Sequence, residues 1–358
     1  MNRSDSLQID GVMLNYFIGD PYLSSYSVVM LDEAHERSVN TDALFGILKC
    51  LLQRRLDLKV VVTSATLDCE KFSQYFNDAP ILNVPGRVYP VEIIHSNNLR
   101  FGPTDTDQIV TATVSKVLEI HSEGAPGDIL VFMPGQMEID RVIEKIKDGI
   151  FAIRAAGQLD LYPCYASMPW ETQQQIFNAA PIRGRKVVVA TNIAETSVTI
   201  DGIVYVVDSG IGKVSTLNLN TGVVHLNTIR ITKAQANQRS GRAGRTQPGK
   251  AYRLYSEADY EGFEESPTPE IQRLSVVDIA FKLLCIGITP EFKFMDPPSE
   301  EMMRAAVRTL QDLGAINENQ QIDFIGVADE KISNGTRAFK NSGHVIPVAL
   351  HRGSVKHC

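Results

Sequence analysis

The stretch Val28-Val29-Met30-Leu31-Asp32-Glu33-Ala34-His35 decides the fold class. An apolar run of strand length ends in two adjacent carboxylates, and an imidazole follows after one further residue. In open α/β sheets, ligands bind at the carboxyl ends of parallel strands. Two carboxylates at that place can hold Mg²⁺ on a nucleotide and activate a neighbouring water. These residues alone leave open the alternative of a buried strand that runs into an acidic surface turn.

Length and composition limit the classes of protein to which the chain can belong. The 358 residues predict two or three domains, and 44% apolar and 22% charged residues are typical of globular proteins. No run is long and apolar enough to predict a membrane span or a membrane partner. The five scattered cysteines form no CxxC pair, so we expect reduced thiols in a nuclear or cytoplasmic protein and no zinc site. We also expect a monomer. A formal charge of −7 predicts that any nucleic-acid contact is local.

Short β-branched runs alternate with helix-like segments, which is the pattern of doubly wound parallel sheets. The runs that we expect to form buried strands are 28–31, 59–63, 129–133, 161–165, 186–190 and 203–207. The expected helices are 41–53, 136–147, 170–179, 271–285 and 299–313. A polar stretch at Ser96–Asp107 predicts a linker, and Val214–Thr232 predicts a β-hairpin that turns at Asn220-Thr221-Gly222.

Three further segments carry residues suited to phosphate chemistry. Ser64-Ala65-Thr66 places two hydroxyls after a strand, although alone it is an ordinary capping turn. Gln238-Arg239-Ser240-Gly241-Arg242-Ala243-Gly244-Arg245 places arginines beside small residues, where they can neutralise a departing phosphoryl group; a solvated basic loop is the alternative. The stretch 191–202 offers hydroxyls and an amide to phosphates and 2′-hydroxyls, or is simply a Thr-rich turn.

Taken in chain order, these segments resemble motifs II, III, V and VI of the DEAH-box RNA helicases of superfamily 2. Further similarity lies at 129–136 (motif IV), at Asp10-Gly11 (motif Ib) and at Met295-Asp296-Pro297-Pro298 (the winged-helix region), and the likeness covers roughly residues 8–316. The resemblance implies an α/β fold with two RecA-like, P-loop NTPase-type parallel-sheet domains, the first incomplete, followed by a small winged-helix domain.

The resemblance also implies domain boundaries. We expect residues 1–95 to form a partial first RecA-like domain, 96–258 the second, 259–316 the winged-helix domain and 317–358 a divergent, disordered tail. No GxxxxGK[ST] segment precedes the acidic pair, so we expect a chain that is N-terminally truncated before motif II.

An ATP-dependent RNA helicase that uses ATP and Mg²⁺ and moves 3′ to 5′ is the implied activity. In the family, Asp32 would hold Mg²⁺, Glu33 would activate the attacking water, and Gln238 would help to position it. Arg242 and Arg245 would be arginine fingers. Contact with the nucleotide or coupling to its state is implied for further residues, namely His35, Ser64, Thr66, Phe177 and Asp201. The alternative for Phe177 is core packing.

RNA is the implied partner, as a single strand and at a duplex junction beside the hairpin, with a protein activator also possible. The residues implied to contact or sense RNA are Gly135, Gln136, Thr191, Asn192, Thr196 and Ser197. Two other hypotheses stay open. In one, the chain is a catalytically inactive product that only binds RNA or protein; in the other, it belongs to a DNA-directed translocase of the same superfamily.

Overall fold

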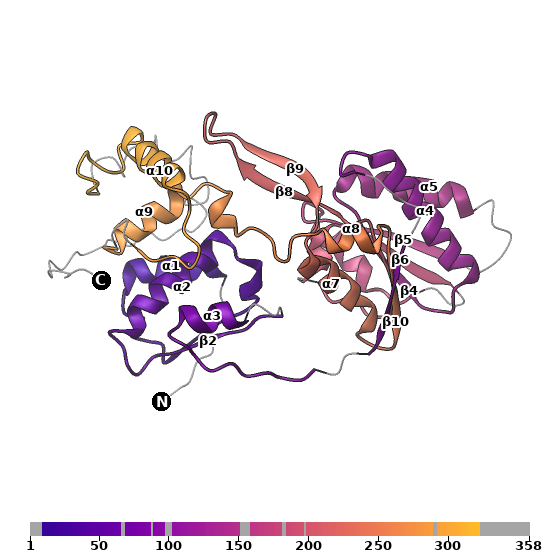
Figure 1. Cartoon of the computed structure of the whole chain (residues 1–358), viewed down its shortest axis with the longest axis horizontal. Coiled ribbons are helices and arrows are strands. Elements are labelled where there is room, and N and C mark those ends of the chain that lie inside the picture. Colours follow the sequence, from indigo (N-terminus) through magenta and orange to yellow (C-terminus); the bar gives the residue numbers. More distant parts are fainter. Residues whose placement is uncertain are drawn as a thin grey trace. The chain divides into compact units, whose positions relative to one another are not determined.

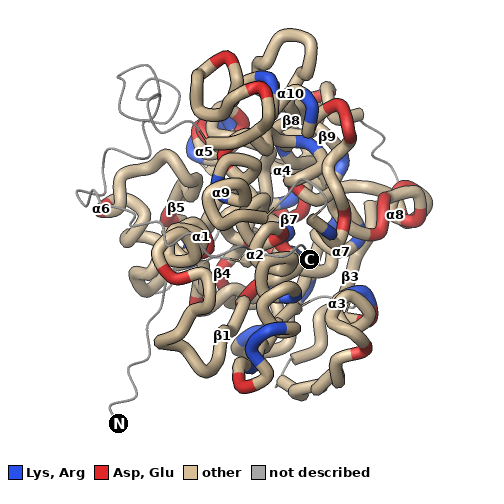
Figure 2. Tube along the Cα trace, turned by 90° about the vertical axis from the view of Figure 1, so that its left-hand side faces the viewer, with Lys and Arg blue, Asp and Glu red and all other residues tan. Residues whose placement is uncertain are grey.

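The chain folds into two compact units (Figure 1). Unit 1 contains residues 1–82, 216–225 and 268–358, and unit 2 contains residues 83–215 and 226–267. The computed structural model describes residues 9–65, 69–86, 89–96, 102–150, 158–180, 184–196, 198–288 and 292–322. Acidic and basic side chains are interspersed along the described trace (Figure 2), in keeping with the modest net charge.

Unit 1 is built around a short parallel ladder between β1 (Val28–Leu31) and β2 (Lys59–Val62). Both strands confirm the bounds expected from their apolar runs to within one residue. The remaining elements of the unit are helices α1 (Asp10–Gly19), α2 (Val39–Leu52), α3 (Cys69–Tyr75), α9 (Val277–Cys285) and α10 (Glu300–Asp312), with 3₁₀ turns at Ala34–Glu36 and Glu270–Gln272.

The core of unit 1 lies on one face of this ladder. Val29 and Leu31 point into it, whereas Val28 is 52% exposed and Met30 is 62% exposed. Parallel strands are usually covered on both faces. Among the described residues, the β1–β2 ladder therefore has one apolar face open to solvent.

The C-terminal part of unit 1 packs directly on α2. A Cβ placed at Gly46, in the middle of α2, would lie 1.9 Å from the Phe292 ring, so only glycine fits this approach. Ile279 and Leu283 of α9 join the same buried cluster as the apolar face of α2. Helices α9 and α10 confirm the two predicted helices, although the first begins six residues later than expected.

Unit 2 contains a parallel sheet of six described strands in the order β3-β10-β7-β4-β6-β5. The strands are β3 (Val91–His95), β4 (Asp128–Phe132), β5 (Leu159–Cys164), β6 (Arg185–Ala190), β7 (Ile203–Asp208) and β10 (Gly249–Arg253). Strands β4, β6 and β7 are buried along their whole length, as continuous β-branched runs predict.

Both faces of the sheet of unit 2 are covered. Helices α4 (Thr106–Glu123) and α5 (Gln136–Ile150) pack on one face, as Figure 1 shows. On the opposite face, residues of three 3₁₀ turns are buried against the sheet. Helix α7 (Lys233–Gly241) contacts β7. The other elements are helices α6 (Trp170–Gln173) and α8 (Glu257–Glu261) and 3₁₀ turns at Gln174–Phe177, Asn192–Ala194 and Arg242–Gly244. This doubly wound arrangement confirms the predicted α/β class.

The predicted hairpin is present, formed by β8 (Ile211–Leu217) and β9 (Val224–Arg230). Gly222 adopts a φ of +69° at its turn, a conformation that glycine adopts without steric cost. No described helix is both long enough and apolar enough to cross a bilayer.

Two expected domain boundaries differ from the observed ones. The first domain was expected to extend to residue 95, but β3 (Val91–His95) pairs with β10, and unit 2 begins at Asn83. The third domain was expected to begin at residue 259, but unit 2 continues to Pro267 and the helical segment beyond it belongs to unit 1. Pairing partners more than 150 residues away decide where β3 lies, and no local pattern encodes them.

Candidate nucleotide and RNA site

The acidic pair lies at the carboxyl end of β1, as predicted. Asp32 and Glu33 are both exposed. The Asp32 Oδ1 atom accepts hydrogen bonds from the Glu33 backbone N–H at 3.0 Å and from the Thr63 hydroxyl at the end of β2. Glu33 has a left-handed backbone with φ 49°. The pair is therefore accessible to a ligand and oriented by its own loop.

His35 links the acidic turn to the loop after β2. Its Nδ1 accepts a hydrogen bond from the Ala65 backbone N–H at 3.3 Å and lies 3.4 Å from a Glu33 carboxylate oxygen. The ring is 6% exposed, and its Nε2 is buried without a hydrogen-bond partner among the described residues. Ser64 lies in the same loop, whereas Thr66 falls outside the described residues. The acidic segment 32–35 and the segment 64–66 were expected to lie close together. The contact between His35 and Ala65, which is next to Ser64, agrees with this expectation.

Hard carboxylate oxygens of Asp32 and Glu33 fit Mg²⁺. The described chain holds no group of three or more His, Cys, Asp or Glu side chains able to bind a metal ion. Mg²⁺ commonly takes one or two carboxylates and completes its shell with water and substrate phosphates. These residues therefore fit a metal that arrives on a nucleotide, and they do not form a closed metal cage.

Residues expected to contact RNA lie together at the carboxyl edge of the unit 2 sheet. Gly135 and Gln136 follow β4, and Thr191, Asn192 and Thr196 follow β6. Strands β4 and β6 are hydrogen-bonded neighbours, with Phe132 opposite Ala190 at their ends. Ser197 falls outside the described residues. The sheet thus brings two separate sequence segments to one edge.

Lys213, on β8, adds a cation to this edge that the sequence did not indicate. Its ammonium lies 3.0 Å from a Glu138 carboxylate oxygen. A Cβ built on Gly135 would come within 2.4 Å of the same ammonium, so glycine at this position leaves room for it. Lysine within a hairpin carries no periodic signal that could have pointed to it.

Several residues of unit 2 that are expected at the nucleotide lie toward the opposite, amino edge of its sheet. Asp201 is exposed and lies two residues before β7. An Arg242 Nη1 donates to the Val198 carbonyl at 3.1 Å, and an Arg245 Nη1 donates to the Thr199 hydroxyl at 2.6 Å. Gln238 does not join this group: it is half-buried on α7, and its neighbours Asn237 and Arg239 bond Arg253 and Asp208 at the carboxyl ends of β10 and β7.

Phe177 is exposed to 53%, which contradicts core packing as its role. The helix expected over 170–179 ends at Gln173, and a 3₁₀ turn follows it. The buried ammonium of Lys186, on β6, donates to the carbonyls of Ile176 and Asn178, at 3.0 Å each. Lys186 thus occupies the two carbonyls that flank Phe177 and holds its ring outward at the start of β6.

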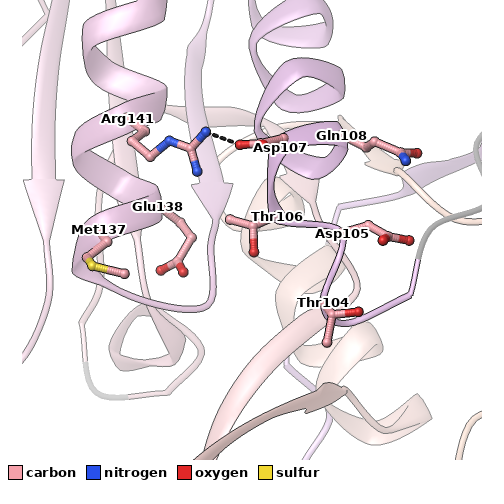
Figure 3. A pocket seen from close by; sticks show the side chains of 8 residues that line it. All are labelled: Thr104, Asp105, Thr106, Asp107, Gln108, Met137, Glu138 and Arg141. Atoms are coloured by element: carbon pink, nitrogen blue, oxygen red, sulfur yellow. Dashed lines mark hydrogen bonds and ion pairs between the residues drawn. The ribbon is translucent and has the colours of Figure 1, made fainter.

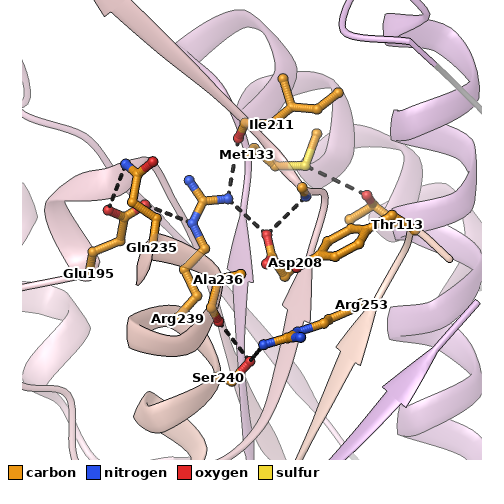
Figure 4. Close-up of polar contacts among 12 residues, drawn as sticks. Thr113, Met133, Glu195, Asp208, Ile211, Gln235, Ala236, Arg239, Ser240 and Arg253 are labelled. Carbon is orange, nitrogen blue, oxygen red and sulfur yellow. Dashed lines mark hydrogen bonds and ion pairs between the residues drawn. The ribbon is translucent and has the colours of Figure 1, made fainter. Parts of the chain in front are cut away.

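A buried polar network ties α7 to the carboxyl ends of the strands of unit 2 (Figure 4). Arg239, on α7, is 1% exposed; its Nε donates to Glu195 at 2.7 Å and its Nη1 donates to Asp208 at 2.8 Å. Burial opposes charge on the guanidinium, but the two carboxylates outweigh it and raise the pKa of Arg239. Burial raises the pKa of Glu195 in spite of its arginine partner. Helix α7 is thereby fixed to the ends of β6 and β7.

Arg239 has a structural role that sequence reasoning missed, because the first arginine of the segment looks like the other two. The signal was present in helical spacing. Ala236, Arg239 and Ser240 are the buried residues of α7 and lie three and four positions apart on one face.

A solvent-open pocket of about 510 Å³ lies apart from the expected nucleotide residues (Figure 3). It is lined by the first turns of α4 and α5, and Arg141 pairs with Asp107 across it. The hydrogen bond from Arg141 lowers the pKa of the exposed Asp107 carboxyl. Met137 and Glu138 of the lining directly follow Gln136.

Comparisons with known proteins agree with this arrangement. Residues 112–247 match the helicase conserved C-terminal domain. The chain is 47% identical over 321 residues to the pre-mRNA-splicing factor ATP-dependent RNA helicase prp22 of Schizosaccharomyces pombe, covering 88% of the chain and 27% of that protein.

Solved structures show the same likeness. Two crystal structures of Escherichia coli HrpB, described as a DEAH/RHA helicase and as a DExH-box NTPase, are 34% identical with TM-scores of 0.75. They match 88% of this chain, which covers 39% and 38% of the HrpB chains. The chain thus spans well under half the length of these relatives. With its motifs in family order and this likeness in sequence and fold, the chain belongs to the DEAH-box RNA helicases.

Proposed function

We propose that the chain provides the water-activating and RNA-contacting parts of an ATP-dependent RNA helicase. The exposed acidic pair at the carboxyl end of β1, joined by His35 to the Ala65 loop, is the observation that supports it most strongly. In this proposal Asp32 holds Mg²⁺ on ATP, and Glu33 accepts a proton from the attacking water. Mg²⁺, when bound, neutralises phosphate charge.

The second part of the proposal assigns unit 2 to charge neutralisation and to RNA. Arg242 and Arg245 would approach the γ-phosphate, Gln238 would orient the water, and Asp201 with Phe177 would contact the nucleotide. Gly135, Gln136, Thr191, Asn192, Thr196 and Ser197 would contact single-stranded RNA, mostly through phosphates and 2′-hydroxyls. Support comes from the grouping of these residues, apart from Gln238 and Ser197, at two opposite edges of one sheet.

Movement along RNA from 3′ to 5′, coupled to hydrolysis, completes the proposal. Because activation of water and neutralisation of charge belong to different units, hydrolysis would require the units to close on one triphosphate. The hairpin would then stand at a duplex junction. The splicing factor among the relatives supports a nuclear location, and a protein activator stays part of the proposal.

The test measures two quantities on the whole chain: release of phosphate from Mg·ATP with and without single-stranded RNA, and binding of that RNA by fluorescence anisotropy. Turnover that Glu33→Gln abolishes, with RNA binding retained, supports the enzyme. RNA binding without any turnover supports the inactive binding module instead. Tighter binding to single-stranded DNA than to RNA of the same sequence would favour the DNA-directed translocase, and loss of both signals would overturn the proposal.

A further inference from the structure

The turn that carries the acidic pair has an uncommon backbone. Glu33 and Arg37 both adopt left-handed conformations, with φ 49° and 48°, on either side of the 3₁₀ turn Ala34–Glu36. Residues other than glycine seldom adopt this conformation, and it persists only where the surroundings hold it. Something beyond local sequence must therefore stabilise this turn.

The Arg37 side chain is the main anchor at the end of the turn. Its Nε donates to Asp42 Oδ1 at 2.6 Å, and its Nη2 donates to Asp42 Oδ2 at 3.0 Å. The same Nη2 donates to Asp296 Oδ2 at 2.6 Å. Arg37 is 8% exposed and Asp42, on α2, is fully buried, so both of these charges depend on their partners.

The C-terminal segment of unit 1 holds Arg37 at two points. Asp296 binds the guanidinium, and the Glu270 backbone N–H donates to the Arg37 carbonyl at 3.1 Å. A Glu270 carboxylate oxygen also accepts from the Val39 N–H at 3.3 Å, in the first turn of α2. We name Glu270 and Asp296 the C-terminal clamp.

Asp296 is held in its charged form by two cations. Lys71 Nζ donates to both of its carboxylate oxygens, at 2.8 and 2.7 Å. Partial burial disfavours the charge, but the hydrogen bonds from Lys71 and Arg37 outweigh it and keep the pKa of Asp296 below its ordinary value. Asp296 contacts neither Asp32 nor Glu33 in any described hydrogen bond, so its influence on the pair must pass through Arg37.

We infer that Asp296 is a positioning residue for the acidic pair, and that the C-terminal clamp makes the geometry of the pair depend on the C-terminal helical segment. Through Arg37, the clamp maintains the left-handed turn that presents Glu33. A ligand or partner that displaces Asp296 would loosen the turn and slow the activation of water. The effect of Asp296 on hydrolysis rests on the proposed function. The dependence of the Glu33 turn on Asp296 does not.

Amide hydrogen exchange on the whole chain tests the link. The Glu36 N–H donates to the Glu33 carbonyl at 2.9 Å, and the Arg37 N–H donates to the Ala34 carbonyl at 3.3 Å, so both amides report on the turn. Asp296→Asn is expected to speed their exchange by about tenfold or more, as the loss of a charge-assisted hydrogen bond predicts. Asp296→Glu should restore much of the protection. Arg304→Met, which removes an exposed ion pair with Glu300 on α10 of the same segment, is the control and should leave both amides protected.

The outcomes separate the link from the proposed function. Unchanged exchange at Glu36 and Arg37 in Asp296→Asn, with α2 still protected, would overturn the positioning role. Arg37→Lys supplies a second variant in case Asp296→Asn unfolds unit 1, and the same loss of protection is expected. If the chain turns over ATP, Asp296→Asn should lower kcat with little change in the KM for ATP. Faster exchange in a chain without turnover would support the link and count only against the proposed function.

Discussion

Replacing Arg239 by methionine tests whether the buried network of unit 2 is essential to its stability. The variant removes a guanidinium that bonds Glu195, Asp208 and the Ile211 carbonyl. Removing one partner of a buried ion pair costs about 3–5 kcal/mol, because the remaining charge is left uncompensated. Asp208 keeps hydrogen bonds from Gly210 N–H and Tyr255 hydroxyl, both at 2.9 Å. We therefore expect a loss near the lower end, about 3 kcal/mol.

Hydrogen exchange in increasing urea is the suitable assay, because a chain of two units does not unfold in a single transition. The free energy of opening is read from amides of β7 and β4, which lie at the centre of the unit 2 sheet. Arg245→Met removes an exposed arginine of the same segment and should change that free energy by no more than about 0.5 kcal/mol. Arg239→Met combined with Glu195→Gln and Asp208→Asn should recover part of the loss, since no buried carboxylate then remains unpaired.

If Arg239→Met and Arg245→Met were equally stable, the reasoning would be refuted. Such a result would mean that water or rearranged side chains satisfy Glu195 and Asp208 once the guanidinium is gone. Arg239→Lys should have a stability between those of Arg239→Met and Arg245→Met. Its ammonium retains the charge but lacks the planar fork that reaches both carboxylates.

Four further predictions concern single positions. Burial raises the pKa of Cys164 to about 11, so at pH 8 only about one thiol in a thousand is ionised; alkylation followed by mass spectrometry should be slow in the native chain and rise about tenfold per pH unit. Labelling as fast as in urea would contradict this. Gly46→Ala should destabilise unit 1 by about 1–3 kcal/mol, because its Cβ would overlap Phe292, and exchange of α2 amides measures it. Phe177→Ala should change stability by less than about 0.5 kcal/mol, against about 3–5 for a core phenylalanine, while raising the KM for ATP of a chain that turns it over. Ser299→Ala should cost about 1 kcal/mol in unit 1, because the Ser299 hydroxyl caps α10; an unchanged thermal midpoint would argue against the cap.

The sequence predicted most reliably those elements whose signal is local. Strands β1, β4, β6 and β7 lie within one residue of their expected bounds, because a strand buried on both faces, or on one, is a compact apolar run. The end of the β1 apolar run also predicted correctly that the acidic pair directly follows a strand. Periodicity and run length carried these predictions, and they require no knowledge of distant contacts.

Local sequence patterns did not predict the features that depend on distant partners. The helix expected over 170–179 ends at Gln173 and is followed by a 3₁₀ turn, and the carbonyls of Ile176 and Asn178 bind Lys186 on the following strand, a contact that no local pattern records. Strand β3 belongs to unit 2 because β10 pairs with it, at a separation no local pattern records. The role of Arg239 likewise depends on Glu195 and Asp208, which lie 44 and 31 residues away in the chain.

Within the proposed function, the position of Arg239 offers a link between RNA contact and charge neutralisation. Glu195 and Asp208 hold Arg239 in the last turn of α7, and Arg242 follows directly as the C-cap of that helix. Buried ion pairs with full hydrogen bonding resist small displacements, because a partly separated pair leaves uncompensated charge. A shift of the loop after β6 would therefore be transmitted to Arg242 and Arg245 through a rigid helix, without rearrangement inside unit 2. If so, Arg239→Lys, which loosens this joint while retaining the charge, should weaken the stimulation of turnover by RNA more than it weakens RNA binding.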